Sequence, residues 1–422
     1  MSFSENTTEH RVGPVRLRVY PMQVSRVISI AGSFDLWPDI EAGEELLASV
    51  TAAMLDKGSR RRDRFELASI LEDRGARVTF SVSGTRLEMT AHLLADDLPV
   101  VMEVLGEQVC SPAFEPAELE KVRARLLGSI RRNATEPAVL ASAALSGRLY
   151  PAGHPNREES PEQEERWLAA LTRDDVEIFH RRTFRGDGVR IAVAGDVDSG
   201  ALIEAIAAAF SPWNPEMATS RAYPGAGPVE ASTEIVSLPD RPNLEVRMGH
   251  AVGLCRNDPD YEPLVLGCFA LGGNFSARLM GRVRDDLGLT YGISSGIRGV
   301  DVHHGGAWRT SVTLSADRLD EGLAATRTEL ERFVAEGLRG EEVEEKAETL
   351  AGQFTVSLST TSAVADALLG TLERGESLDR FDGYAGRIRS YGVDRVNDTI
   401  RRWLDPSRLV TAVAGTVIRS ER

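Results

Sequence analysis

Residues Leu271–Gly296, LGGNFSARLMGRVRDDLGLTYGISSG, hold the local pattern that decides the fold of this half of the chain. The stretch predicts a turn, a helix and a strand, in that order. A Gly-Gly turn comes first, and Asn274 or Ser276 can cap the helix. Apolar residues recur at every fourth position from Phe275 to Leu287, which is the spacing of one helical face.

Two polar side chains lie on either side of the point where this helix ends. Gly288 stops the helix, so Arg284 lies in its last turn and Tyr291 in the strand that follows. A sharp reversal of the chain at the glycine could direct both side chains to one place. Taken by themselves, these residues have ordinary interpretations: Arg284 is typical of a cation near a helix C-terminus, and Tyr291 of an aromatic in a half-buried strand.

The composition is that of an ordinary globular protein. The chain has 422 residues, 42% hydrophobic and 27% charged, which is enough for two or more domains. Its net charge of −15 argues against nucleic acid or an anionic membrane as the main partner.

The cysteines and the N-terminus predict a cytoplasmic location. The three cysteines lie far apart and form neither a disulfide framework nor a C-x-x-C metal knuckle. The opening segment contains no apolar signal region, and no later run of about 18 apolar residues could span a bilayer.

The second half of the sequence repeats the first. Gly75 and Gly288 end similar helices, and the AVAG of Ala192–Gly195 recurs at Ala412–Gly415. Both offsets are near half of the chain length, which indicates a duplication. We therefore predict an N-terminal domain at 1–211, a Pro-rich linker at 212–232 and a homologous C-terminal domain at 233–422. The fold class is α+β, with a mostly antiparallel sheet and helices on one of its faces in each domain.

Other candidate sites in the sequence are weaker. No two histidines have the i, i+4 spacing of a helical zinc site, which argues against a metal site in this chain. GISSG satisfies the nucleophile pattern G-x-S-x-G with Ser294, but that pattern needs a helix directly after it, and the following residues favour a strand and a turn. Four arginines, Arg60, Arg61, Arg62 and Arg64, are expected on a solvated loop, with contact to an acidic partner as the alternative.

The chain from about Val15 to Gly415 resembles the pitrilysin or insulinase family of metallopeptidases, which share this duplication. Active members have an inverted zinc motif, H-x-x-E-H, on their first long helix, before a K-G-[ST] turn. In this chain ELLASVTAAMLDKGS takes that place. Ser49 and Ala53 replace the two histidines, and Ala52 replaces the catalytic glutamate. The third ligand, a glutamate on a later helix, corresponds to Ser129 in RLLGSIRRNATEP. The resemblance implies a degenerate motif with no metal or cofactor in this chain.

The second half keeps a different part of the family pattern. In members that cut peptides, R-[ED]-x-x-G-L-x-Y supplies an Arg and a Tyr that face the zinc across the chamber. RDDLGLTY places Arg284 and Tyr291 in register with it. The repeat-equivalent positions of the first half hold Leu71 and Val78 or Thr79, so the pair is specific to the second half.

The resemblance thus implies a zinc-free subunit of a heterodimeric zinc peptidase, inactive alone. Its partner would be a homologous subunit with H-x-x-E-H, which carries the zinc. Arg284 and Tyr291 would stabilise the transition state on a bound peptide. The alternative is a structural or peptide-binding subunit of the same family with no role in cleavage. An independent serine hydrolase based on Ser294 is the third interpretation.

Overall fold

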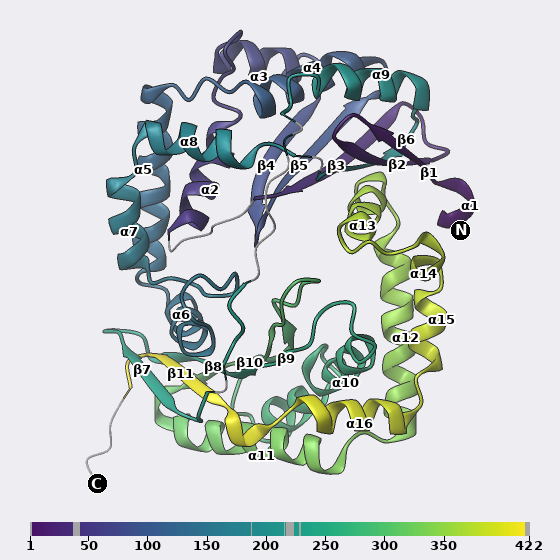
Figure 1. Cartoon of the computed structure of the whole chain (residues 1–422). Helices are drawn as coiled ribbons and strands as arrows, with labels where there is room; N and C mark the ends of the chain where they lie inside the picture. Colours follow the sequence, from purple (N-terminus) through teal and green to yellow (C-terminus); the bar gives the residue numbers. More distant parts are fainter. Residues whose placement is uncertain are drawn as a thin grey trace. The chain divides into compact units, whose positions relative to one another are not determined.

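The computed structural model describes residues 2–36, 43–186, 188–214, 216, 223–227 and 229–417. These form two compact units, each built on one β-sheet (Figure 1). The first unit comprises Met1–Gly128, Glu164–Arg221 and Phe354–Gly383, and the second comprises Ser129–Gln163, Ala222–Gln353 and Tyr384–Arg422. Each unit thus includes a segment from the other half of the sequence. The predicted linker at 212–232 lies partly outside the described residues.

The first unit has a six-stranded sheet in the order β1-β2-β6-β3-β5-β4. Its strands are β1 (Thr8–Val12), β2 (Val15–Pro21), β3 (Val27–Asp35), β4 (Arg77–Ser83), β5 (Arg86–Leu94) and β6 (Val189–Gly195). Its helices are α1 (Phe3–Asn6), α2 (Glu44–Met54), α3 (Arg64–Glu72), η1 (Ala95–Asp97), α4 (Leu98–Cys110), α8 (Arg173–Thr183), α9 (Ser199–Ala209), α13 (Thr361–Glu373) and α14 (Leu378–Asp382).

The second unit has a five-stranded sheet in the order β7-β11-β8-β10-β9. Its strands are β7 (Thr233–Ser237), β8 (Asn243–Ala251), β9 (Ile293–Arg298), β10 (Ala307–Ser315) and β11 (Val410–Gly415). Its helices are α6 (Pro137–Leu149), α10 (Tyr261–Gly272), η2 (Met280–Asp286), η3 (Ala316–Arg318), α11 (Leu319–Glu336), α15 (Tyr384–Ser390), α16 (Val393–Trp403) and η4 (Pro406–Arg408). Three helices contain residues of both units: α5 (Pro116–Asn133), α7 (Pro161–Ala170) and α12 (Gly340–Ser357).

The two sheets share one topology, which confirms the predicted α+β fold with two homologous halves. From the edge inward, β4-β5-β3-β6 and β9-β10-β8-β11 are each antiparallel throughout, and the next strand, β2 or β7, is parallel. The repeated AVAG ends β6 and β11. Its glycines, Gly195 and Gly415, have φ of +138° and +137°, a region that other residues rarely adopt.

Each sheet is covered on both faces at its centre. The strands β6 and β11 are buried along almost their whole length, which is typical of strands with helices on both sides. In the first unit α13 packs on β3 and β6, on the opposite face from α4 and α9 (Figure 1). In the second unit α6 packs on β8 and β11. The sequence predicted helices on one face of each sheet. In the structure α13 and α6 cover the other face as well.

Candidate functional site

The helix α2 carries three of the four positions that the resemblance assigns to the zinc motif, 49, 52 and 53. It begins after Gly43, which has a φ of +97°, and two glutamates in its first turn interact favourably with the helix dipole. Val50 and Met54 are fully buried in the core. A different face of the helix, which includes Ser49 and Ala53, borders a cavity in the first unit.

This α2–β4 cavity has a volume of about 330 Å³. Its helical wall consists of residues at i, i+3, i+4 and i+7, and its strand wall is a run of five consecutive residues. The full lining is Ser49, Ala52, Ala53, Asp56, Lys57, Val78, Thr79, Phe80, Ser81, Val82 and Arg125. Three of the four degenerate positions, 49, 52 and 53, therefore lie together.

Ser129, the fourth position, does not line this cavity. It is half-buried on α5, one helical turn after Arg125. Within the described residues, no group of three or more His, Cys, Asp or Glu side chains could hold a metal ion. Hydroxyl and methyl groups at the four positions offer neither the imidazole nor the carboxylate ligands that zinc uses in peptidases.

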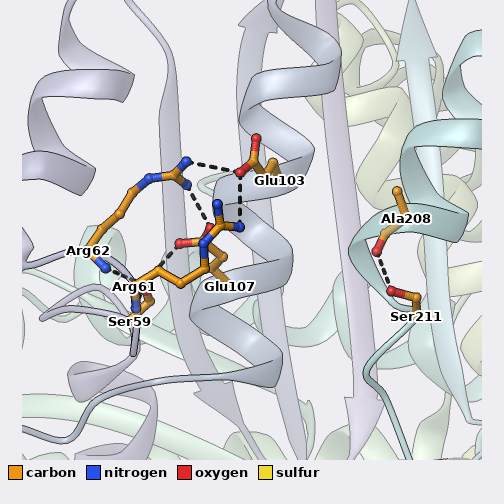
Figure 2. A network of polar contacts seen from close by, with 7 residues as sticks. All are labelled: Ser59, Arg61, Arg62, Glu103, Glu107, Ala208 and Ser211. Carbon is orange, nitrogen blue, oxygen red and sulfur yellow. Dashed lines mark hydrogen bonds and ion pairs between the residues drawn. The ribbon is translucent and has the colours of Figure 1, made fainter.

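The loop after α2 is held to α4 by charged side chains (Figure 2). Ser59 Oγ donates to Glu107 Oε2 at 2.9 Å, and Arg62 Nη1 donates to Glu107 Oε1 at 2.7 Å. Arg62 Nη2 also donates to Glu103 at 2.9 Å, and Arg61 pairs with Glu107 at 3.0 Å. Burial acts to lower the pKa of Arg62, but these two carboxylates outweigh it and raise the pKa above its usual value.

Arg61 is 67% exposed, as expected for a solvated loop, but Arg62 is only 23% exposed and pairs with two carboxylates, so the expectation is wrong for Arg62. Their acidic partners lie on α4, beyond an intervening helix and two strands, so no local pattern reveals them. The network fixes the loop that follows Lys57, a residue of the cavity wall.

Arg284 lies on η2, which is a π-helix rather than the predicted α-helix. The helix begins late, with Leu279 at its N-cap and no side-chain cap, so the predicted caps at Asn274 and Ser276 are wrong. Phe275 is 78% exposed and does not belong to the buried face, whereas Leu279 is fully buried. Hydrophobic spacing alone did not reveal that the chain between Gly272 and the helix remains a turn.

The Arg284 side chain is 40% exposed and lies above an aromatic ring. Its guanidinium carbon is 5.8 Å from the ring centre of Phe275, and its nearest carboxylate, Asp285, is 3.9 Å away. Contact with an aromatic face leaves most of the donor groups of a guanidinium available. Arg284 is thus a cation at the surface with only a weak ion pair.

Tyr291 lies in a bend two residues before β9, not within the strand as predicted. It is 97% exposed. Its side chain borders a second cavity, of about 440 Å³, called here the Tyr291 cavity. The lining is Glu245, Arg247, Gly272, Gly273, Asn274, Phe275, Met280, Tyr291, Gly292, Ile293, Ser294, Ser311, Val312 and Thr313. Phe275 thus contacts Arg284 and shares the cavity with Tyr291.

Ser294 lies on β9, and the chain then continues through a loop into β10. No helix follows it directly, so GISSG is not a nucleophile elbow, and it lies at the start of β9. Ser311, its neighbour on β10, pairs with it in register.

Comparisons with known families match both halves of the chain. The family model described as "Insulinase (Peptidase family M16)" matches residues 47–154, which include most of α2. The model described as "Peptidase M16 inactive domain" matches residues 170–350, which include Arg284 and Tyr291.

Individual relatives are similar over most of their length. An uncharacterized zinc protease of Streptomyces coelicolor is 23% identical over 414 residues, covering 93% of this chain and 88% of that protein. The non-peptidase homolog YmxG of Helicobacter pylori is 21% identical over 369 residues, covering 87% and 84%.

Solved structures share the fold. A peptidase M16 inactive domain from Pseudomonas fluorescens has a TM-score of 0.89 at 20% identity, covering 99% of this chain and 100% of that one. A protease from Helicobacter pylori has a TM-score of 0.83 at 16% identity, covering 97% and 99%. Within the described residues, no helix is long and apolar enough to cross a membrane.

Proposed function

Since this chain belongs to the insulinase (M16) family of peptidases, we propose that it is the zinc-free subunit of a two-chain zinc peptidase. A homologous subunit with an intact H-x-x-E-H motif supplies the zinc, and Arg284 and Tyr291 complete that subunit's active site. One observation carries the proposal: Tyr291 leaves its phenol exposed beside an open cavity, whereas Ser49, Ala52 and Ala53 hold the zinc-motif positions.

The residues that line the α2–β4 cavity do not fit a catalytic zinc ion. A catalytic zinc site uses three protein ligands drawn from His, Asp, Glu and Cys. Among the residues that line the α2–β4 cavity, Asp56 is the only one of these types. The chain alone is therefore expected to have no peptidase activity.

Arg284 and Tyr291 suit a role in stabilising the transition state. Hydrolysis of a peptide bond builds negative charge on the carbonyl oxygen, and a guanidinium and a phenol can both donate hydrogen bonds to it. A guanidinium keeps its charge in a poorly solvated chamber. Because Tyr291 is exposed and Arg284 has only a weak ion pair, little must be broken before they reach a substrate.

The substrate in this proposal is an extended peptide that pairs with β9. In the described sheet β9 is an edge strand and pairs with β10 alone. The Tyr291 cavity touches the consecutive residues 291–294, so it follows the chain into the free edge of that strand. Strand addition supplies affinity through the backbone and leaves side chains to the cavity.

The test is to co-purify this chain with a homologous subunit that contains H-x-x-E-H and to measure cleavage of peptides. Tyr291→Phe and Arg284→Ala should each lower kcat about 10²–10³-fold, the usual effect of losing one oxyanion donor. Arg282→Ala is the matched control, because Arg282 lies on the same helix, is 51% exposed and pairs with Asp286. A pair no more active than the zinc subunit alone would refute the proposal.

A second candidate is a non-catalytic subunit that binds peptides or stabilises a complex. It is favoured by the match of residues 170–350 to the inactive domain of the family and by the similarity to YmxG. It predicts stable assembly without cleavage, and Tyr291→Phe and Arg284→Ala should leave that assembly unchanged.

We further propose a cytoplasmic location, with neither nucleic acid nor membrane as a partner, from the charge and cysteine pattern of the sequence.

A further inference from the structure

The β-sheet of the second unit is open to solvent on part of one face, beside its edge strand β9. The register of β8, β10 and β9 places alternate residues of each strand on this face, and the residues between them are largely buried. The helix α6 covers this face at β8 and β11. Toward the edge, Ser294 and Arg298 of β9 are exposed, and Arg309 and Ser311 of β10 are half-buried.

Gly296, in the middle of β9, leaves a gap in this face. Apart from its two chain neighbours, the first atoms that a methyl group at Gly296 would meet belong to the Arg298 guanidinium, at 3.9 Å. The register places Arg309 directly opposite Gly296 on β10, with Ser294 and Ser311 beside it on the two strands. Four polar side chains thus surround one open position, called here the Gly296 gap.

Most donors around the gap have no partner among the residues that the structure describes. The Arg298 guanidinium makes no hydrogen bond or ion pair with them, and the hydroxyls of Ser294 and Ser311 make no hydrogen bond. Arg309 Nη1 donates to Glu158 Oε1 at 3.1 Å. Glu158 is 45% exposed, so water screens this ion pair. The gap can therefore offer two guanidinium groups and two hydroxyls to one acceptor.

The arginines on this face outnumber the carboxylates that pair with them. Arg247 of β8 is a third guanidinium on the face, and its Nη1 donates to Glu245 Oε2 at 2.8 Å. Glu245 and Glu158 thus each pair with one arginine, and Arg298 keeps its charge without a carboxylate among the described residues. An ionised carboxylate is an acceptor only, and it forms strong charge-assisted hydrogen bonds with guanidinium groups. It therefore matches the donors around the gap.

The Gly296 gap adjoins the Tyr291 cavity, because Ser294 and Ser311 border both. In the proposed function an extended peptide pairs with β9, so each peptide side chain lies on the same face as that of the β9 residue opposite it. The peptide residue opposite Gly296 then directs its side chain over the gap. Gly296 comes five residues after Tyr291, so this peptide residue lies about five positions, or roughly 17 Å, from the bond that Tyr291 contacts.

We propose that the Gly296 gap selects an acidic residue of the peptide: the carboxylate of a Glu or Asp side chain lies over Gly296 and accepts hydrogen bonds from Arg298 and Arg309. Ser294 and Ser311 complete the set of donors. The inference rests on the proposed function for its peptide, but these contacts need neither zinc nor cleavage. The substrate class is thus an extended peptide with an acidic residue about five positions from the bond that is cut.

Fluorescence anisotropy with the purified full chain tests this proposal. A labelled Thr/Val peptide with one central Glu, blocked at both termini, is compared with the same peptide carrying Gln. The Glu peptide should bind about tenfold more tightly, because a neutral amide lacks the charge-assisted bonds. The difference should shrink at high salt, since the gap is open to solvent. Equal affinities, or no binding of either peptide, would overturn the proposal.

Variants around the gap locate the carboxylate. Arg298→Gln should weaken binding of the Glu peptide about fivefold and leave the Gln peptide unchanged. Gly296→Thr fills the gap and should lower the affinity for the Glu peptide to that for the Gln peptide. Glu158→Gln releases Arg309 and should strengthen binding of the Glu peptide. An unchanged affinity for the Glu peptide in Arg298→Gln would overturn the proposal.

Arg332→Gln is the matched control. Arg332 lies on α11 of the same unit, is 58% exposed and pairs with Glu336, so the variant removes one positive charge away from the gap. Equal losses of affinity in Arg332→Gln and Arg298→Gln would reduce the effect to net charge and overturn the proposal. A peptide without Glu but with a free C-terminus should bind as weakly as the blocked Gln peptide. Tight, Arg298-dependent binding of it would replace the side chain with a terminal carboxylate and overturn the proposal.

Cleavage assays separate this inference from the proposed function. With a zinc subunit present, a series of peptides with Glu at each position in turn should show the lowest KM when Glu lies about five positions from the cut bond. Arg298→Gln should remove that minimum and leave kcat unchanged. Tyr291-dependent cleavage without a preference for Glu would overturn the inference and leave the proposed function intact. Arg298-dependent binding of the Glu peptide by a pair that does not cleave would support the inference and refute the proposed function.

Discussion

Glu107→Gln should destabilise the first unit, because Glu107 is the shared acceptor for the loop after α2. Its side chain is 9% exposed and contacts Ser59, Arg62 and Arg61 (Figure 2). The neutral amide loses the negative charge and directs an N–H group at one of these donors. A hydrogen bond to a charged group contributes about 1.5–3 kcal/mol, and the exposed Arg61 adds less than about 1 kcal/mol.

In the Glu107→Gln variant Arg62 keeps its second partner, Glu103. The free energy of unfolding should therefore fall by about 2 kcal/mol, near the lower end of that range. Native-state hydrogen exchange measures it, because the slowest amides of β3 and β5 report the free energy of unfolding of their own sheet. Their exchange should become about 30-fold faster, since about 1.4 kcal/mol is a factor of ten.

Glu103→Gln is the control for this prediction. Glu103 is 45% exposed and accepts only from the two arginines, so its loss should cost less than about 1 kcal/mol. The view that the network holds this loop would be refuted if Glu107→Gln changed the free energy of unfolding by less than about 0.5 kcal/mol, or if both variants changed it equally. The slowest amides of β8 and β10, in the second sheet, should exchange as before.

Three further predictions concern other parts of the chain. Phe275→Ser should change thermal stability by less than about 0.5 kcal/mol, because Phe275 is 78% exposed, whereas the fully buried Leu279→Ala should cost about 2–5 kcal/mol. Burial lowers the pKa of His180 to about 4. The unfolded chain then binds more protons between pH 6.5 and 4, so stability should fall as the pH falls through that window, and His180→Gln should flatten this dependence in urea titrations. Asp260→Asn should destabilise the second unit by about 2 kcal/mol in hydrogen exchange, because the 4%-exposed carboxylate accepts bonds from an indole and two guanidinium groups. An unchanged free energy of unfolding for Leu279→Ala or for Asp260→Asn would contradict the packing described for that side chain. An unchanged pH dependence of stability in His180→Gln would contradict the burial of His180.

The repeat and the fold class could be read from the sequence because both depend on local patterns. AVAG recurs where β6 and β11 end, and both glycines have the same positive φ. In contrast, the packing of α6 and α13 on the other sheet faces depends on pairings between segments far apart in the chain, which no local period encodes.

The candidate site divides in the same way. The sequence indicated Arg284 and Tyr291 by their spacing around Gly288, but it assigned Phe275 to a buried face. The structure gives Phe275 a surface position beneath Arg284 and on the wall of the Tyr291 cavity, because the turn after Gly272 continues and the helix begins at a later residue. A hydrophobic period shows which residues could share a face and not where the helix begins.

The sequence by itself determined the duplication and the presence of RDDLGLTY in one half only, and the family resemblance assigned positions 49, 52, 53 and 129 to the zinc motif. These follow from residue types and spacing, which are properties of the chain. Only the tertiary structure decided that three of the degenerate positions border a cavity along the edge of β4, and that Lys57 and Arg125 border it with them. That grouping arises because α2, β4 and α5 lie far apart in the sequence, and burial of apolar side chains, not sequence proximity, brings them together.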